Sequence, residues 1–237
     1  MLFERRAYTL RPGSEDAFWQ LQRKFSVPAK VRPLLERNIG FFAVSAGPAE
    51  LIVHLYRWDD YNDSKRRLAA IATPDRTDYF VAARALLLRQ ETSYLDLAPI
   101  AALNPCWGDG RDWLPNEPLF ANSGEATALA VSESVLDFVP GGLVGYWEGY
   151  RRLDSKTMDI VRAGLIGVFV VTTGLLHRVI HYHRHHSLSE ADDHRRMLAK
   201  DPAWNAFSDS YRPAVIDSYC SYLRPSPVPW MRPFRAD

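Results

Sequence analysis

Two runs of nine residues in this chain are similar: Ile39-Gly40-Phe41-Phe42-Ala43-Val44-Ser45-Ala46-Gly47 and Ile166-Gly167-Val168-Phe169-Val170-Val171-Thr172-Thr173-Gly174. The leading glycines are 167 − 40 = 127 residues apart. The same offset relates further identical pairs: His54 and His181, Arg57 and Arg184, Ala72 and Ala199, Phe80 and Phe207. A period this long exceeds that of a solenoid repeat, so we expect each copy to be a whole small domain.

Composition is that of a globular protein and excludes several functional classes. The 237 residues are 47% hydrophobic and 24% charged, with a formal net charge of +1. This balance gives no electrostatic reason to expect binding to nucleic acid or to an anionic membrane. The longest apolar stretch, Leu165 to Leu176, has 12 residues, whereas a membrane helix needs about 20. The two cysteines are too few for a disulfide framework, and no secretory signal opens the chain. We predict a cytoplasmic protein with no membrane span.

The repeat predicts three segments: a first domain at residues 1–100, an ordered linker at 101–126 and a second domain at 127–237. The linker is rich in Asn, Pro and Gly but also carries large apolar residues, namely Trp107, Trp113, Leu114 and Phe120. We expect it to pack against the domains as a strap, and a lid over a pocket is the alternative. Gly108-Asp109-Gly110 follows no predicted strand and opens no predicted helix, so we interpret it as a turn.

Both copies show the same order of elements. In copy one the patterns predict strands at 2–10, 40–46, 51–58 and 89–97, with a helix to Phe25 capped by Ser14 and broken at Pro28 and Pro33, and a helix over 63–87 interrupted at Pro74. In copy two they predict strands at 128–138, 165–173, 177–185 and 216–223, a helix over 143–163, and a helix over 189–212 interrupted at Pro202. This order, βαββαβ, is the ferredoxin-like arrangement.

The chain resembles the NIPSNAP family, on residues from both copies. They are Phe3-Glu4-Arg5-Arg6-Ala7-Tyr8-Thr9-Leu10-Arg11-Pro12-Gly13, the run Gly40…Gly47…Val53-His54-Leu55-Tyr56-Arg57-Trp58, the run Gly167…Gly174…Ile180-His181-Tyr182-His183, and Leu198-Ala199-Lys200-Asp201-Pro202-Ala203-Trp204-Asn205-Ala206-Phe207. The resemblance implies an α+β fold of two ferredoxin-like βαββαβ domains paired as an intramolecular dimeric α/β barrel. Such a chain is a pseudo-dimer by itself, and whether it also forms a homo-oligomer stays open. Pairing is physically reasonable because a ferredoxin-like sheet covers only one face with its own helices. The family has no single established reaction.

The copies differ in their polar residues. At an offset of 128, Glu4, Arg6 and Tyr8 become Ser132, Ser134 and Leu136. Six of the seven histidines fall in copy two: His177, His181, His183, His185, His186 and His194. These differences predict an asymmetric site.

Strand alternation predicts which side chains share a face. His181, His183 and His185 point the same way, and the matching positions in copy one are His54, Tyr56 and Trp58. The opposite face of copy one carries Val53 and Leu55, and these apolar residues favour contact with the helices. The histidine and aromatic set would then face the barrel interior together with Arg6 and Tyr8. Such a concave, semi-polar interior is a natural site for a small molecule.

Three interpretations of the histidines remain open. In the leading one, His181 or His183 carries a proton, Arg6 and Tyr8 orient the ligand, and His54, Tyr56 and Trp58 help to bind it. In the second, His181 and His183, about 6.6 Å apart along the strand, ligate a metal or haem. No third ligand is evident at a matched position, so we expect no metal and no organic cofactor. In the third, the histidines have a structural role or are exposed to solvent, and this applies particularly to His185, His186 and His194. For Arg6, an ion pair with Glu4 is an equal alternative.

The leading functional hypothesis is therefore a cofactor-independent enzyme. It would perform isomerase, cyclase or lyase chemistry by proton transfer on an oxygenated aromatic or polyenoic metabolite, of the kind found in specialised metabolism. The first alternative is a non-catalytic ligand-binding or scaffolding protein whose interior is packed. The second is a metal or haem protein with histidine ligands.

Overall fold

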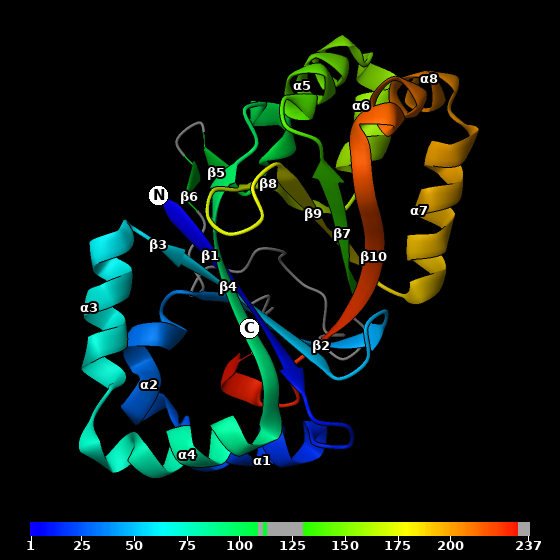
Figure 1. The fold of residues 1–237 in the computed structure, drawn as a ribbon. Helices are drawn as coiled ribbons and strands as arrows, with labels where there is room; N and C mark the ends of the chain where they lie inside the picture. Colours follow the sequence, from blue (N-terminus) through cyan, green and yellow to red (C-terminus); the bar gives the residue numbers. More distant parts are fainter. Residues whose placement is uncertain (109–110, 113–129, 232–237) are drawn as a thin grey trace. The chain divides into compact units, whose positions relative to one another are not determined.

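The computed structural model of the chain describes residues 1–108, 111–112 and 130–231 (Figure 1). These residues divide into two compact units. Unit one comprises residues 1–95 and 224–231, and unit two comprises 96–108, 111–112 and 130–223. Most of the predicted linker, including Trp113, Leu114 and Phe120, lies outside the described residues. So do residues 109–110 of the predicted glycine turn.

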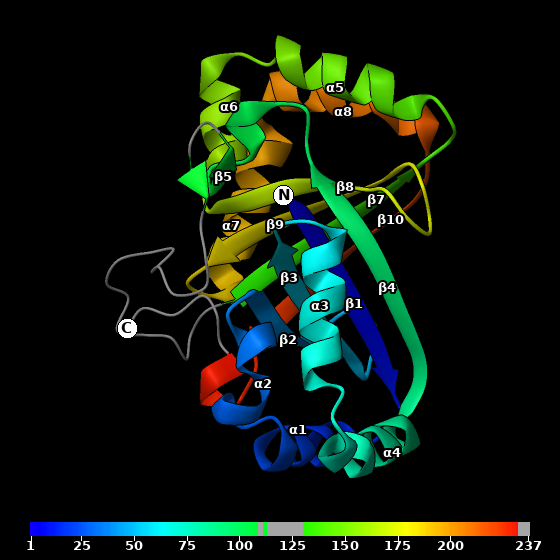
Figure 2. The same ribbon diagram turned by 90° about the vertical axis from the view of Figure 1, so that its left-hand side faces the viewer.

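Unit one has a four-stranded antiparallel sheet in the order β4-β1-β3-β2. Its register places Arg6 opposite His54 of β3 and Thr92 of β4. The helices of this unit cover one face of the sheet (Figure 2). The elements are β1 (Leu2–Leu10), α1 (Glu15–Phe25), α2 (Pro28–Leu35), β2 (Asn38–Ala46), β3 (Leu51–Trp58), α3 (Tyr61–Ile71), η1 (Pro74–Arg76), α4 (Thr77–Leu86), β4 (Leu87–Leu97) and, near the C-terminus, η4 (Pro229–Met231).

Two local expectations for unit one hold only in part. Ser14 occupies the N-cap position of α1, but its side chain makes no capping hydrogen bond. The first helix ends at Phe25, before Pro28, as predicted, but Pro28 then opens α2, and Pro33 lies inside that helix. The reason at Pro28 is that proline lacks an N–H, and at the first helical position that N–H would have no partner in the helix. The predicted interruption at Pro74 is confirmed, because η1 separates α3 from α4.

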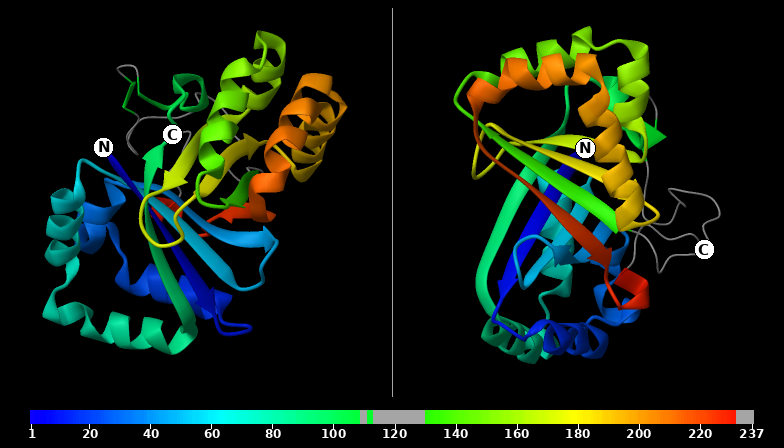
Figure 3. Two further views of the ribbon diagram at one scale, coloured as in Figure 1. Left: turned by 45° about the horizontal axis from the view of Figure 1, so that its top comes forward. Right: turned by 90° about the vertical axis from the view of Figure 1, so that its right-hand side faces the viewer.

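Unit two repeats the arrangement, with sheet order β10-β7-β9-β8. Its register places Ser134 opposite His181 and Ser132 opposite His183. Its helices also gather on one face of the sheet (Figure 3). The elements are η2 (Ala101–Leu103), β5 (Trp107–Gly108), β6 (Arg111–Asp112), β7 (Ala130–Phe138), α5 (Gly142–Arg152), α6 (Ser155–Arg162), β8 (Leu165–Val171), β9 (Arg178–His185), α7 (Leu188–Lys200), α8 (Pro202–Tyr211), η3 (Arg212–Ala214) and β10 (Val215–Pro225).

The helix predicted over 143–163 is in fact two helices. The backbone is extended at Leu153, which ends α5. Asp154 then caps α6, because its side chain accepts a hydrogen bond from the backbone N–H of Thr157. Aspartate is a preferred N-cap residue, so the signal for this break was present in the sequence.

Each unit has its own apolar core between sheet and helices. In unit one, Phe18 and Trp19 of α1 pack with Phe41 and Ile52, and Met231 joins them from η4. The backbone N–H of Ser226 donates to the carbonyl of Phe41 at 2.7 Å, which ties the segment after β10 to β2. In unit two, the core groups Phe138, Tyr146, Trp147 and Phe207.

The predicted fold class is confirmed. The chain is α+β, and its eight long strands follow the order of a closed barrel, β1-β3-β2-β10-β7-β9-β8-β4. Each half has the βαββαβ order of a ferredoxin-like domain, with its two helical segments divided further. Within the described residues, no helix has the length and apolar character needed to cross a membrane.

Candidate functional site

The histidine-bearing face of each sheet lies under that unit's own helices. In unit one, a cavity is lined both by His54 and Tyr56 of β3 and by side chains from α1, α2, α3 and α4. The prediction that Val53 and Leu55 meet the helices is therefore wrong. The hydrophobic pattern could not show which face of β3 contacts the helices, because both faces are buried: Val53 is 0% exposed and His54 is 3% exposed.

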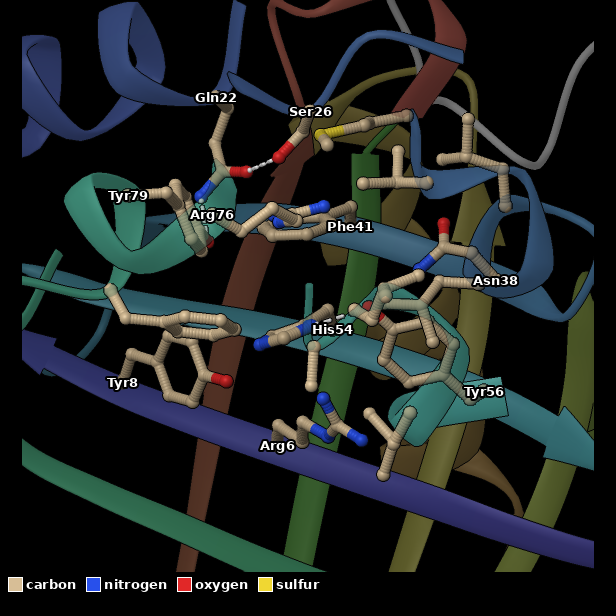
Figure 4. Close-up of a pocket in the computed structure, with 18 residues that line it drawn as sticks. Arg6, Tyr8, Gln22, Ser26, Asn38, Phe41, His54, Tyr56, Arg76 and Tyr79 are labelled. Atoms are coloured by element: carbon tan, nitrogen blue, oxygen red, sulfur yellow. Dashed lines mark hydrogen bonds between the residues drawn. The ribbon is translucent and has the colours of Figure 1, made fainter. Parts of the chain in front are cut away.

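The unit-one cavity has a volume of about 300 Å³ and a mixed polar and apolar lining (Figure 4). None of the described residues that line it is acidic. They are Arg6, Tyr8, Gln22, Ser26, Val31, Leu34, Leu35, Asn38, Phe41, His54, Tyr56, Leu68, Ile71, Ala72, Arg76, Tyr79, Phe80 and Met231.

Arg6 is held in a buried ion pair, as the alternative interpretation predicted. Its Nε donates to Glu4 Oε1 at 2.7 Å and its Nη2 donates to Glu4 Oε2 at 3.1 Å. The indole N–H of Trp58 donates to the same carboxylate at 2.7 Å. Trp58, predicted to bind ligand, is fully buried behind this pair and does not line the cavity. Since both oxygens of Glu4 are occupied, the charge of Arg6 is already balanced.

His54 lies at the centre of the cavity wall (Figure 4). Its ring stacks on Phe41 at 4.3 Å between centroids and meets the edge of Tyr8 at 4.5 Å. Its Nδ1 is 3.1 Å from the hydroxyl of Tyr56, and its buried Nε2 has no partner among the described residues. Burial, and then the charges of Arg6 and Arg5, hold the pKa of His54 well below its usual 6.5. The imidazole is therefore neutral at neutral pH.

Arg76 was not among the predicted site residues. Its side chain is 3% exposed, and its guanidinium lies over the ring of Tyr79 at 4.6 Å. Within the described part of the chain, its Nε and Nη1 have no hydrogen-bond acceptor. The sequence around Arg76 predicted only a helix interruption at Pro74. A difference between the copies could have identified Arg76: at the offset of 127, this arginine corresponds to an alanine, Ala203.

Neutral hydroxyl and amide groups complete the polar wall. Gln22 donates to the hydroxyl of Tyr79 at 2.9 Å and accepts from Ser26 at 2.7 Å (Figure 4). Burial raises the pKa of Tyr8 to about 12 and that of Tyr56 still further. Both phenols therefore stay protonated and can donate hydrogen bonds.

The unit-two cavity has a volume of about 380 Å³, and the described residues that line it are all uncharged. Its described lining is rich in aromatic and hydroxyl groups. The residues are Ser134, Val135, Leu136, Tyr146, Tyr150, Val161, His181, His183, Leu198, Trp204, Tyr211, Ser218, Tyr219 and Cys220. Arg6 and Tyr8 thus line one cavity, and His181 and His183 line the other, so the expectation of a single site that contains all four is wrong.

His181 forms a short hydrogen bond with a tyrosine from the covering helix. The hydroxyl of Tyr146 in α5 is 2.8 Å from His181 Nε2. Burial lowers the pKa of His181 to about 4 and raises that of Tyr146 well above 10. Both groups are neutral at neutral pH, and which of them donates depends on the imidazole tautomer.

The other histidines of β9 are bound to protein groups. His183 Nε2 donates to the carbonyl of Val161 at 3.0 Å, and His185 Nε2 lies 3.0 Å from the hydroxyl of Ser132. Burial lowers the pKa of His183 to about 3 and that of His185 to about 4. His194 of α7 lies beside them and donates to the carbonyl of Ile160, whereas His186 is exposed. Among the described residues, no three His, Cys, Asp or Glu side chains form a group that could hold a metal ion.

Solved structures with the same overall fold span nearly the whole chain. A proposed monooxygenase from Fusobacterium nucleatum subsp. nucleatum matches with a TM-score of 0.60 and 10% identity, over 95% of this chain and 92% of that one. An anthrone oxidase-like protein matches with a TM-score of 0.59 and 12% identity, over 94% and 90%. At these identities the matches show a shared fold alone.

Other proteins are more similar to this chain in sequence. An uncharacterised NIPSNAP-like domain protein from Burkholderia xenovorans is 33% identical, over 42% of this chain and 85% of that one, with a TM-score of 0.37. No protein with a curated description matches. The NIPSNAP family model matches residues 3–102 and 133–229, which together make up most of both copies. The chain therefore belongs to the NIPSNAP family, as a member with two family segments in tandem.

Proposed function

We propose that this protein is a small-molecule enzyme that works by acid–base chemistry in the unit-two cavity, with His181 as the proton carrier. The observation that carries the proposal is the 2.8 Å contact between His181 Nε2 and the Tyr146 hydroxyl on the cavity wall. It brings a neutral base and a neutral hydrogen-bond donor together where water is largely excluded. Such a pair suits proton abstraction next to an oxygen substituent.

The chemistry requires one tautomer of His181. When His181 donates from Nε2 to the tyrosine oxygen, its Nδ1 is the base and the hydroxyl of Tyr146 remains a donor. A proton then moves from the substrate to Nδ1, and the electron pair stays on the substrate as an enolate or phenolate that accepts a hydrogen bond from Tyr146. Return of the proton at another position completes an isomerisation without a co-reactant. The negative charge on the substrate offsets the burial that lowers the pKa of His181.

The cavity lining supports an oxygenated aromatic substrate. Aromatic rings of Tyr150, Trp204 and Tyr211 line the cavity, and its described lining offers no charged side chain to bind an ionised group. One fold relative is named an anthrone oxidase-like protein, and an anthrone is an aromatic ketone with an acidic carbon. The likeness shows fold only, so the substrate class rests on the lining of the cavity.

Hydrogen exchange into anthrone tests the proposal. In deuterated buffer without oxygen, the wild-type protein should accelerate exchange at the acidic carbon by at least about a hundredfold over buffer, measured by NMR. His181→Asn should lose most of this acceleration and keep its melting temperature. His186→Asn, which removes an exposed histidine just beyond β9, is the matched control and should behave as wild type.

Retention of wild-type exchange by His181→Asn would contradict the proposed role of His181. Saturable binding of anthrone with no exchange above buffer would instead support the alternative, a non-catalytic ligand-binding protein.

A further inference from the structure

We propose that the unit-one cavity is a separate binding site for an aromatic carboxylate, and that Arg76 binds the carboxylate group. This site goes beyond the proposed function, because it uses other residues in another cavity. The described residues that line it all belong to unit one.

Arg76 carries a buried positive charge that no described acceptor balances at Nε or Nη1. A guanidinium is always ionised in proteins, and burying its N–H groups without acceptors is costly. Within the described residues, Arg76 has ring contacts with Tyr79 and Phe80 but no acceptor for Nε or Nη1. A carboxylate binds a guanidinium in bidentate geometry either at the edge formed by Nε and Nη2 or at the edge formed by Nη1 and Nη2, so at either edge it would accept from one of these two unpartnered donors. The structure thus presents a carboxylate receptor on the cavity wall.

Among the described residues, no anion in the cavity competes for Arg76. Glu4 already binds Arg6 and Trp58, so Arg6 contributes little net charge. The described lining includes no acidic side chain. One uncompensated cation therefore remains, which suits a ligand with a single negative charge and is a poor match for a doubly charged phosphate.

The rest of the cavity wall consists largely of aromatic rings and also carries polar atoms without partners among the described residues. Phe41 and His54 stack on one another, and Tyr8 and Phe80 add further ring surfaces. Flat aromatic walls favour a flat aromatic ligand. His54 Nε2 and Asn38 Oδ1 also lack partners among the described residues, so a ring hydroxyl on the ligand would find a hydrogen bond. The ligand class is therefore an aromatic carboxylate, and a hydroxyl on its ring is favoured.

Copy two supports the assignment by contrast. At the offset of 127, Arg76 and Tyr79 become Ala203 and Ala206. The guanidinium and the ring on which it lies are both absent there, although the histidine of the matching strand is kept as His181. The arginine and tyrosine are thus not required by the fold that the two copies share.

Calorimetric titration of the full chain with 2-naphthoate and with its neutral analogue 2-naphthamide tests the proposal. Wild type should bind the carboxylate at least about tenfold more tightly than the amide, because the charge-assisted bonds form only with the carboxylate. Arg76→Gln should abolish that preference. Arg84→Gln removes an exposed arginine from α4, the helix that follows Arg76 directly, and should leave the preference intact. His181→Asn should also leave it intact, which separates this proposal from the proposed function.

Wild-type protein that binds both probes equally or neither of them, or Arg76→Gln that keeps the preference, would overturn the proposal. If Arg76→Gln does not fold, Arg76→Lys replaces it: this variant keeps the charge but loses the fork, and should show a reduced preference.

The melting temperature gives a second, independent test. Because Arg76 is buried without an acceptor, Arg76→Met should raise the melting temperature of the ligand-free protein. Wild type should regain the difference when 2-naphthoate is added, and the variant should not respond. A lower melting temperature for Arg76→Met would show that Arg76 stabilises the fold through a partner, and would overturn the assignment.

Discussion

Unit one encloses a buried ion pair and a second arginine, whereas in the matching cavity of unit two the described lining residues are all neutral. Both units keep a histidine at the same strand position, His54 in one and His181 in the other. What changed is its surroundings: Arg6 of β1 is replaced by Ser134 of β7. The comparison teaches that the repeated scaffold fixes where an imidazole lies, and that neighbouring strands and helices decide its chemistry.

Because, among the described residues, the ion pair is present only in the unit-one cavity, we expect a substitution there to cost more folding stability than the matching substitution in unit two. Glu4→Gln leaves Arg6 buried without a counter-charge, which should lower the free energy of unfolding by about 3–5 kcal/mol. Its counterpart in unit two, Ser132→Ala, removes only a neutral partner of His185 and should cost about 1–2 kcal/mol. Urea denaturation of both variants measures the difference.

Glu148→Gln is the matched control for this pair. Glu148 is exposed on α5, and its ion pair with Arg152 is long, at 3.8 Å. The change should stay within about 0.5 kcal/mol of wild type. Equal losses for Glu4→Gln and Ser132→Ala would mean that the ion pair of unit one does not set the two cavities apart.

Acid should destabilise unit two through its buried histidines. The pKa of His181 is about 4 in the folded protein, against 6.5 when unfolded, so below pH 6.5 the unfolded chain binds the proton first. Stability therefore falls as the pH drops from 6.5 towards 4, by about 3 kcal/mol for this residue alone. His183 and His185 act in the same direction.

Urea denaturation between pH 7.5 and pH 5 checks this dependence. His181→Asn should make the dependence less steep, and the exposed variant His186→Asn should leave it unchanged. A stability that does not vary over this range in wild type would contradict the burial of neutral imidazoles in unit two.

The sequence was sufficient to predict the fold but only part of each site. The repeat and the alternation of polar residues predicted both sheets and placed His54 and His181 at equivalent positions. They could not assign the buried faces, because Val53 and His54 are equally inaccessible on opposite sides of one strand. Nor could periodicity identify Tyr146, which reaches His181 from a helix 35 residues earlier in the chain. Contacts between helix and sheet depend on packing that spacing within one element does not encode.

The smallest expected effects come from the hydroxyl beside each histidine. In unit one Tyr56 lies on the same strand as His54, two residues away, with its hydroxyl 3.1 Å from Nδ1. In unit two Tyr146 approaches the Nε2 of His181 from α5. Tyr56→Phe and Tyr146→Phe should each lower the free energy of unfolding by about 1 kcal/mol, because each removes one neutral hydrogen bond.

Nitrogen NMR of the imidazoles distinguishes the two variants further. Tyr146→Phe should change the Nε2 signal of His181 and leave His54 unaffected, whereas Tyr56→Phe should change the Nδ1 signal of His54 alone. Because the nitrogen that carries the proton is set by the partner of the other nitrogen, the affected histidine should also redistribute its tautomers. If neither substitution moved its histidine's signals, the tyrosines would be packing neighbours only, and His181 would lack the oriented imidazole that proton transfer requires.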